Sequence, residues 1–226
     1  KGKPMIQWVY ESCSGIFDRL IVATDDQRIM DVVANFNGES MITSMHHKSG
    51  TERCAEVVGN LSGDDYQPDI VVNVQGDEPL IRREQVFTLL EGITLKNADI
   101  STLATRVAYN EKADNPNLVK VVTDKENLAL YFSRQTIPHF RDEKASVKKS
   151  YLQHIGLYAY KTKILKELTE LPPSPLEIAE SLEQLRWLEH GYKIAVQLSA
   201  DKNIGIDTPE DLRDLERMLD NEIGRA

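Results

Sequence analysis

The sequence has few of the features that mark disulfide-stabilised, zinc-binding or membrane-spanning proteins. It contains only two cysteines, Cys13 and Cys54, and both fall in segments with helical patterning. We interpret them as small buried apolar residues in a reducing cytoplasm. No Cys-x-x-Cys pair or Cys/His cluster indicates zinc. Because no apolar run approaches the roughly 18 residues of a membrane-spanning helix, we expect a cytoplasmic protein without a membrane span.

Positive charge is also scarce. Lys and Arg number 27 against 36 Asp and Glu, which gives a formal net charge of −9. The densest basic cluster, Lys144, Lys148 and Lys149, is explained by a solvated loop. Nucleic-acid binders usually carry a basic stripe, so we expect no nucleic-acid partner. An anionic small-molecule substrate is still compatible, since a site can be locally basic on an acidic protein.

Strand-like and helix-like segments alternate in the first half of the chain. Residues 19–24, 39–43 and 70–74 read as strands, the first and last being apolar runs typical of buried parallel strands. One helical pattern, at Met5–Val9, precedes the first strand. The others begin after Asp25 and cover residues 51–61 and 84–95. This order predicts an α/β fold with a doubly wound, mostly parallel sheet.

The middle of the chain has a different pattern. Residues 100–107, 118–123, 128–133 and 151–160 read as strands separated by short turns. They predict a smaller antiparallel extension, at approximately 100–160, around a substrate pocket within a single domain of 226 residues. From Leu176 to Leu188 apolar residues recur at helical spacing, and 193–198 reads as a last strand.

Two acidic motifs are suited to holding a metal. Asp77, in N-V-Q-G-D-E-P at 73–79, follows an apolar strand, where open α/β sheets place ligands. Asp207 immediately precedes Thr208-Pro209-Glu210-Asp211, which has the form of a helix start. Together they are candidate carboxylate ligands for one magnesium ion in phosphoryl transfer. Taken alone, the motif around Asp77 can also be explained as a polar turn, and Asp207 can be explained as an acid with a structural role.

A third motif, at residues 46–53, reads H-H-K-S-G-T-E-R. Gly50 and Thr51 offer backbone N–H groups and a hydroxyl at a helix start, which suits an anionic ligand group. Helix capping explains Thr51 and Glu52 equally well. The adjacent histidines lack the spacing of a metal site.

Polar residues around the later strands and helix form the fourth set. Arg134 suits a substrate carboxylate, because its planar fork matches that group. The other members of the set are His154, Tyr158, Glu183 and Gln184. Taken singly each has an ordinary structural explanation, and Glu183 reads equally as a solvated acid on a helix face.

Eight ordered segments together resemble one enzyme family. They are S-G-T-E-R at 49–53, N-V-Q-G-D-E-P at 73–79, N-P-N-L-V-K at 115–120, Y-F-S-R at 131–134, H-I-G-L-Y at 154–158, P-S-P-L-E at 173–177, L-E-Q-L-R at 182–186 and G-I-D-T-P-E-D-L at 205–212. Their order and spacing are similar to those of CMP-Kdo synthetases (3-deoxy-manno-octulosonate cytidylyltransferases). The set spans nearly the whole chain, so the resemblance is specific.

The resemblance implies a nucleotide-diphospho-sugar transferase fold, a homodimer and a magnesium-dependent reaction. The sugar's anomeric hydroxyl would attack the α-phosphate of CTP, giving CMP-Kdo and pyrophosphate for lipopolysaccharide assembly. It implies that Asp77 and Asp207 hold magnesium and that Ser49, Gly50 and Thr51 lie near the nucleotide. The implied sugar-binding residues are Gln75, Arg134, His154, Tyr158, Glu183 and Gln184.

The chain departs from the family at its start. Family members begin with a strand and a loop like P-A-R-x-x-S-x-R-L-P-G-K-P, which supplies Arg, Ser and Lys to the nucleotide. This chain opens at Lys1-Gly2-Lys3-Pro4, which resembles the segment just after that loop. We expect the native protein to have additional N-terminal residues, and we assign no triphosphate-binding residue.

Two alternatives stay open. A CMP-sialic-acid-type synthetase would use the same reaction with another acidic sugar. A nucleotide-binding regulatory or scaffold protein without catalysis is the alternative from another class. Nucleotidyltransferases that use UTP or GTP with neutral sugars fit less well, because L-E-Q-L-R and H-I-G-L-Y are present.

Overall fold

The computed structural model describes residues 2–61, 66–95, 98–109, 111–141, 149–200, 206, 210–213, 215 and 217. These residues divide between two compact units. One unit comprises Lys1–Val57, Val74–Arg83 and Lys202–Ala226, and the other comprises Val58–Asn73 and Glu84–Asp201. The prediction of a single domain stays a prediction. Among the described residues, none of the helices combines the length and apolar character that a bilayer crossing requires.

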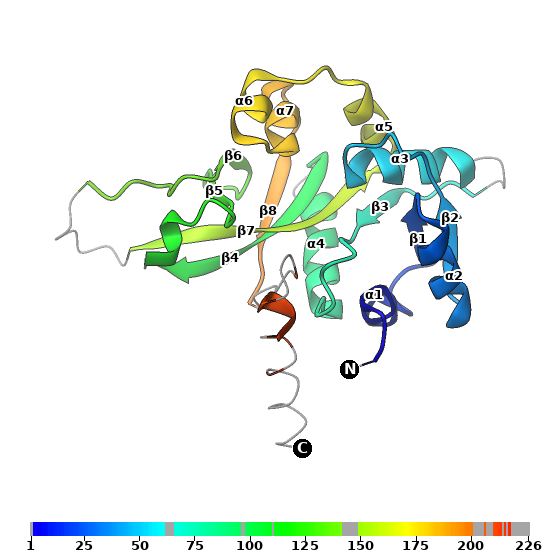
Figure 1. The fold of residues 1–226 in the computed structure, drawn as a ribbon. Coiled ribbons are helices and arrows are strands. Elements are labelled where there is room, and N and C mark those ends of the chain that lie inside the picture. Colours follow the sequence, from blue (N-terminus) through cyan, green and yellow to red (C-terminus); the bar gives the residue numbers. More distant parts are fainter. Residues whose placement is uncertain are drawn as a thin grey trace. The chain divides into compact units, whose positions relative to one another are not determined.

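The helices and strands follow one another in a clear order (Figure 1). They are α1 (Met5–Cys13), β1 (Ile21–Thr24), α2 (Gln27–Asn35), β2 (Glu39–Ile42), α3 (Gly50–Leu61), β3 (Ile70–Asn73), α4 (Arg83–Leu95), β4 (Ile100–Ala108), the 3₁₀ helix η2 (Glu111–Asp114), β5 (Lys120–Thr123), β6 (Ala129–Ser133), β7 (Ser150–Lys161), α5 (Thr162–Glu170), α6 (Pro175–Glu180), α7 (Glu183–Glu189) and β8 (Ile194–Leu198). Residues 210–213, 215 and 217 are helical, whereas Thr208 and Pro209 lie outside the described residues.

In the first unit, β1 and β2 form a parallel pair that begins with Ile21 opposite Glu39. Helix α2 connects them and lies beside both strands (Figure 1). It begins where predicted, because the Asp26 carboxylate accepts a hydrogen bond from the backbone N–H of Arg28 at 2.8 Å. The predicted parallel strands at 19–24 and 39–43 and their connecting helix are therefore confirmed here. The strand at 70–74 also has a pattern typical of a parallel strand, but this is wrong, because β3 pairs antiparallel with β7.

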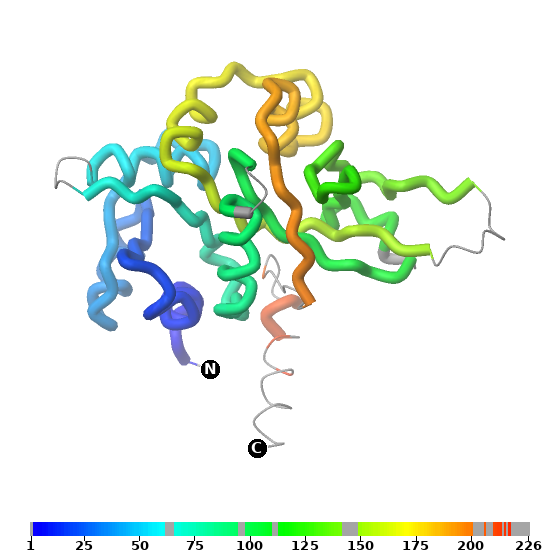
Figure 2. The backbone as a smooth tube through the Cα atoms, turned by 180° about the vertical axis from the view of Figure 1, so that it is seen from behind, coloured from blue at the N-terminus to red at the C-terminus, as the bar shows by residue number. Residues whose placement is uncertain are grey.

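The second unit contains a six-stranded mixed sheet with the order β6-β5-β7-β4-β8, in which β3 also pairs with β7. Strand β4 occupies one edge of β7 throughout. The other edge of β7 is shared by β5, opposite Leu152 and Gln153, and by β3, opposite residues 158–161. All of these pairings are antiparallel, whereas β4 and β8 run parallel. Figure 2 shows the same neighbours from behind.

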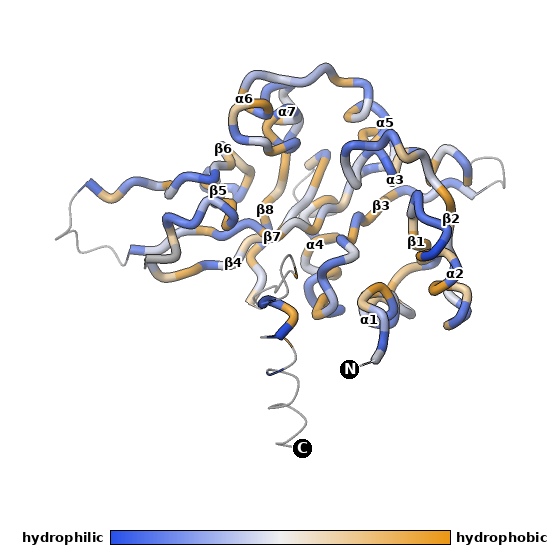
Figure 3. The backbone as a smooth tube through the Cα atoms, in the orientation of Figure 1, coloured by the Kyte–Doolittle hydropathy of each residue, from blue (hydrophilic) through white to orange (hydrophobic). Residues whose placement is uncertain are grey.

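Helix α4 packs closely against β4 in this unit. A Cβ atom added to Gly92 would lie 2.1 Å from the Ser101 Oγ, so only glycine fits that contact. Val86 and Leu89 on the same helix are fully buried. The residues of β8 are mostly apolar (Figure 3), and Ile194 is fully buried as well. A core of this kind gives the sheet a rigid centre.

The sequence was misleading at one helix. Apolar residues from Leu176 to Leu188 predict continuous helical spacing, but the structure contains two helices, α6 and α7. Ser181 separates them with φ 51°, in the left-handed region, and its backbone N–H donates to the Glu177 carbonyl. Helix α5 was not predicted, although its buried Leu165 and Leu168 stand at helical spacing. The four predicted strands of the middle region are confirmed. One of them, β4, also pairs with β8, and this pairing is parallel.

Candidate functional site

The H-I-G-L-Y segment lies at a β-bulge between β4 and β7. Thr102 is opposite Tyr158 and Leu103 is opposite Ile155, so two extra residues of β7 oppose none on β4. On the other edge of β7, residues 154–157 fall between the stretches that pair with β5 and β3. Bulges re-aim side chains and are frequent beside active sites. The bulge thus explains how one short segment presents both His154 and Tyr158.

Aromatic rings surround the bulge. The rings of His154 and Tyr158 have centroids 5.4 Å apart, and Phe132 meets His154 edge-on at 5.1 Å. Trp187 of α7 meets Tyr158 edge-on at 5.3 Å. Burial lowers the pKa of His154 to about 3, which makes the imidazole neutral near pH 7. Burial, with Tyr160 and Glu183 nearby, raises the pKa of Tyr158 well above its usual range, so its phenol stays protonated.

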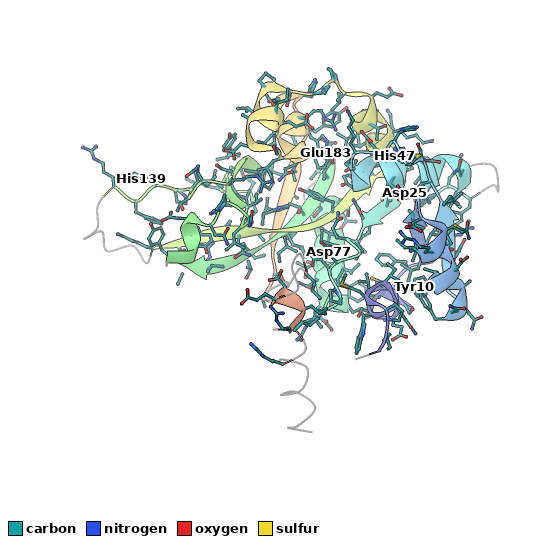
Figure 4. The ribbon with its side chains drawn as sticks, in the orientation of Figure 1. Tyr10, Asp25, His47, Asp77, His139 and Glu183 are labelled. Carbon is teal, nitrogen blue, oxygen red and sulfur yellow. The ribbon has the colours of Figure 1, made fainter. Side chains whose placement is uncertain are left out.

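Glu183, which Figure 4 labels, and Gln184 are the first two residues of helix α7. The buried Arg186 holds Glu183, donating from Nη2 to its Oε1 at 2.9 Å. Gln184 is buried, and Glu183 contributes to the raised pKa of Tyr158. The structure therefore brings three of the predicted sugar-binding residues together, namely His154, Tyr158 and Glu183, and Gln184 is the buried residue next to Glu183.

The structure places Arg134 beside the α6–α7 turn. Its Nε donates to the Glu180 carbonyl at 2.7 Å, and its Nη2 donates to the Ser181 carbonyl at 3.2 Å. Its Nη1 donates to the Pro116 carbonyl at 3.1 Å. These bonds use three of the five N–H donors of the guanidinium. Arg134 therefore joins the α6–α7 turn to the carbonyl of Pro116.

Two residues of this region gave only a weak sequence signal. Lys120 is fully buried and donates from Nζ to the carbonyls of Asn115 and Arg134, at 2.9 and 2.8 Å. Burial lowers its pKa. The only signal was a lysine at the end of N-P-N-L-V-K, directly before apolar residues. No sequence motif singled out Glu180, but it accepts hydrogen bonds from the Ser133 hydroxyl and the Arg134 backbone N–H.

In the first unit, Gln75 and Asp77 lie in the loop that follows β3. Figure 4 labels Asp77. The Gln75 carbonyl accepts a hydrogen bond from the backbone N–H of Glu78 at 3.3 Å, which closes a turn. The Asp77 carbonyl accepts one from the backbone N–H of Ile206 at 3.0 Å. Asp207, the next residue in the chain, lies outside the described residues. In the part of the chain that the structure describes, no three His, Cys, Asp or Glu residues are grouped to hold a metal.

Ser49, Gly50 and Thr51 lie at the N-terminus of the twelve-residue helix α3, as predicted. The Ser49 Oγ caps the helix by accepting a hydrogen bond from the backbone N–H of Glu52 at 3.3 Å. The preceding His47 is held by two acids of the same helix, with Nδ1 3.6 Å from Glu52 and Nε2 bonded to Glu56 (Figure 4). This segment is therefore fixed locally, with a helix N-terminus that suits an anion.

A family model described as "Cytidylyltransferase" matches residues 1–194. The chain belongs to the cytidylyltransferase family. Curated relatives of this cytidylyltransferase include three proteins named 3-deoxy-manno-octulosonate cytidylyltransferase. The protein of Parabacteroides distasonis is 48% identical, covering 93% of this chain and 86% of its own length. That of Bacteroides thetaiotaomicron is 49% identical, covering 97% and 89%. That of Phocaeicola vulgatus is 50% identical, covering 96% and 88%.

Solved structures agree with the cytidylyltransferase assignment. CMP:2-keto-3-deoxy-manno-octonic acid synthetase complexed with CTP matches with a TM-score of 0.88 and 40% identity, over 98% of this chain and 89% of that one. A glucose-1-phosphate thymidylyltransferase from Bacillus anthracis matches with a TM-score of 0.60 and 18% identity, over 95% and 82%. The second likeness concerns the fold alone. Together they confirm the predicted α/β nucleotidyltransferase fold.

Proposed function

We propose that this cytidylyltransferase transfers CMP from CTP to 3-deoxy-D-manno-octulosonate (Kdo), giving CMP-Kdo and pyrophosphate for lipopolysaccharide synthesis. The match to a Kdo-activating synthetase complexed with CTP, over 98% of the chain, carries this conclusion. Relatives at 48–50% identity bear the corresponding enzyme name. Neither the sialic-acid alternative nor the inactive regulatory alternative is favoured by these relatives.

The reaction joins the anomeric oxygen of the sugar to the α-phosphorus of CTP. The bond from that phosphorus to the pyrophosphate oxygen breaks, and the hydroxyl proton is lost. The chain's own contribution is to bind and orient the two substrates, which is the main requirement of phosphoryl transfer. We assign the sugar to His154, Tyr158, Glu183 and Gln184, with Arg134 and Gln75 completing the set. We assign the nucleotide to the helix start at Ser49, Gly50 and Thr51.

Magnesium belongs to this proposal, with Asp77 and Asp207 as its protein ligands. Carboxylate oxygens suit the ion, which commonly takes one or two of them and keeps water on its other positions. The hydrogen bond from Ile206, the residue before Asp207, to the Asp77 carbonyl supports the pairing. When bound, magnesium would neutralise triphosphate charge.

A homodimer and a cytoplasmic location complete the proposal. The resemblance to the family supports the dimer, and the apolar side chains of Leu130 and Ile178 are 61% and 69% exposed. Two cysteines that form no disulfide, together with the use of CTP, support the cytoplasm. Light scattering of the purified protein tests the dimer, and a monomer mass would contradict it.

Pyrophosphate release tests the activity directly. The purified protein is mixed with CTP, magnesium and either Kdo or a sialic acid. We expect release with Kdo. Faster turnover of the sialic acid would replace the proposed substrate, and no release with either sugar would favour the binding protein without catalysis.

A further inference from the structure

Thr102 belongs to none of the sequence motifs, yet its hydroxyl lies at the centre of the bulge. The side chain is fully buried. Its Oγ1 lies 2.9 Å from the Leu157 carbonyl and 3.2 Å from the Ile155 carbonyl, both on β7. It also lies 2.9 Å from Nε2 of His154. One hydroxyl therefore faces three hydrogen-bonding groups of the H-I-G-L-Y segment.

The number of protons decides how these groups are arranged. A threonine hydroxyl has one proton to donate and lone pairs to accept with, and a backbone carbonyl can only accept. If Nε2 of His154 carried a lone pair, three acceptors would compete for that single proton. If Nε2 carries a proton, it donates to Oγ1 of Thr102, and the hydroxyl donates to Leu157. The second arrangement satisfies the buried groups, which strongly favours it.

The rest of the ring follows from its surroundings. Burial keeps the imidazole neutral near pH 7, so it carries one proton. With that proton on Nε2, Nδ1 has a lone pair. Phe132 and Tyr158 contact the ring at centroid distances of 5.1 and 5.4 Å, which limits its rotation.

We propose that Thr102 is a positioning residue that fixes His154 as the Nε2–H tautomer and so presents Nδ1 as a hydrogen-bond acceptor for a sugar hydroxyl. The part concerning the sugar rests on the proposed function, whereas the tautomer does not. An acceptor at this point binds a hydroxyl group as donor and disfavours a carboxylate, which has no proton to give near pH 7. The acidic end of the sugar is thereby directed elsewhere in the site.

The tautomer is measured first, without substrate. Long-range ¹H–¹⁵N NMR spectra of the protein labelled with ¹⁵N-histidine distinguish the protonated ring nitrogen from the unprotonated one. The His154 signals are assigned by their loss in His154→Gln, or by elimination with glutamine at His46, His47, His139 and His190. We expect the Nε2–H pattern at pH 7.5 in the native protein and in Thr102→Ser, which keeps the hydroxyl. An Nδ1–H pattern in the native protein would overturn the proposal, whatever the variants do.

Comparing Thr102→Val with Thr102→Ser then tests whether the Thr102 hydroxyl sets the tautomer of His154. Thr102→Val keeps the shape and removes the hydroxyl, and we expect it to lose the single-tautomer pattern. An unchanged Nε2–H pattern in Thr102→Val would show that Thr102 does not set the tautomer. Thr105→Val, on the same strand, is the control for replacing a buried threonine of β4 and should leave the pattern unchanged.

Kinetics test the role of the acceptor. We expect Thr102→Val to raise the KM for the sugar about 10-fold, the size of one lost hydrogen bond, and to leave the KM for CTP within about 2-fold. Thr102→Ser should restore the KM. An equal rise in both KM values would indicate general damage and contradict the proposal. If the native protein shows the expected tautomer but no turnover of Kdo, the proposed function fails while the assignment of the tautomer stands.

Discussion

Arg134 and Glu180 are joined twice: the Arg134 backbone N–H donates to Glu180 Oε2 at 2.9 Å, and its Nε donates to the Glu180 carbonyl at 2.7 Å. Burial alone would raise the pKa of Glu180. Donors from Ser133, the Arg134 backbone and Tyr131 outweigh burial and hold that pKa below its usual range. An ionised Glu180 therefore fixes the C-terminal end of β6 to the α6–α7 turn, and its backbone carbonyl holds the guanidinium of Arg134.

We predict that Glu180→Gln lowers the free energy of unfolding by roughly 1–3 kcal/mol, because hydrogen bonds to a charged acceptor are weakened. We also expect it to raise the KM for the sugar more than the KM for CTP, since Arg134 is a proposed sugar ligand. Urea denaturation and steady-state kinetics measure the two effects. Glu170→Gln, at the exposed end of α5, is the matched control. Equal results for the two variants would remove Glu180 from this role.

The contact of Gly92 with Ser101 yields a second prediction. Gly92→Ala would place a Cβ 2.1 Å from the Ser101 Oγ and should destabilise the protein by about 1–3 kcal/mol. Gly59 is also helical, but nothing lies within 4 Å of an added Cβ. Gly59→Ala should therefore stabilise it by up to about 1 kcal/mol. Thermal melting of both variants checks the pair, and effects of the same sign would contradict the packing argument.

Local patterns predicted most of the secondary structure, whereas the roles of the site residues come from the family resemblance and stay predictions. The strand at 70–73 and the capped helix after Asp26 follow from apolar runs and capping, which act between neighbours in sequence. The predicted sugar residues of α7 and β7 were recognisable because their motifs are contiguous.

What the sequence did not predict depends on partners far apart in the chain. Thr102 and His154 are 52 residues apart, and Arg134 and Glu180 are 46 apart. The break at Ser181 opposes a regular apolar pattern, because Arg134 takes the carbonyls of Glu180 and Ser181 that a continuous helix would use. No periodicity in one segment reveals a hydrogen bond donated by another.

The lowered pKa of His154 makes stability depend on pH. The usual value is 6.5 and the folded value is about 3, so between these limits the unfolded chain binds more protons. Stability therefore rises with pH in this window and falls as the pH drops below about 6.5. Between pH 7 and pH 5 we expect a loss of roughly 1–2 kcal/mol from this group. Urea midpoints should show a smaller loss in His154→Gln, and an identical pH slope in both proteins would contradict this account.

Asp77 provides the test of the metal proposal. Asp77→Ala removes a carboxylate that would hold the magnesium ion on the triphosphate. Because such an ion stabilises the transition state by several kcal/mol, we expect a rate at least about 100-fold lower. Asp207→Ala should behave alike, since each would supply one ligand. Asp31→Asn, an exposed acid on α2, is the control and should keep the native rate. Chelation of magnesium should abolish turnover in the native protein, and its return should restore it. A near-normal rate in either alanine variant at saturating magnesium would remove that residue from the metal site, because the remaining carboxylate alone would then suffice.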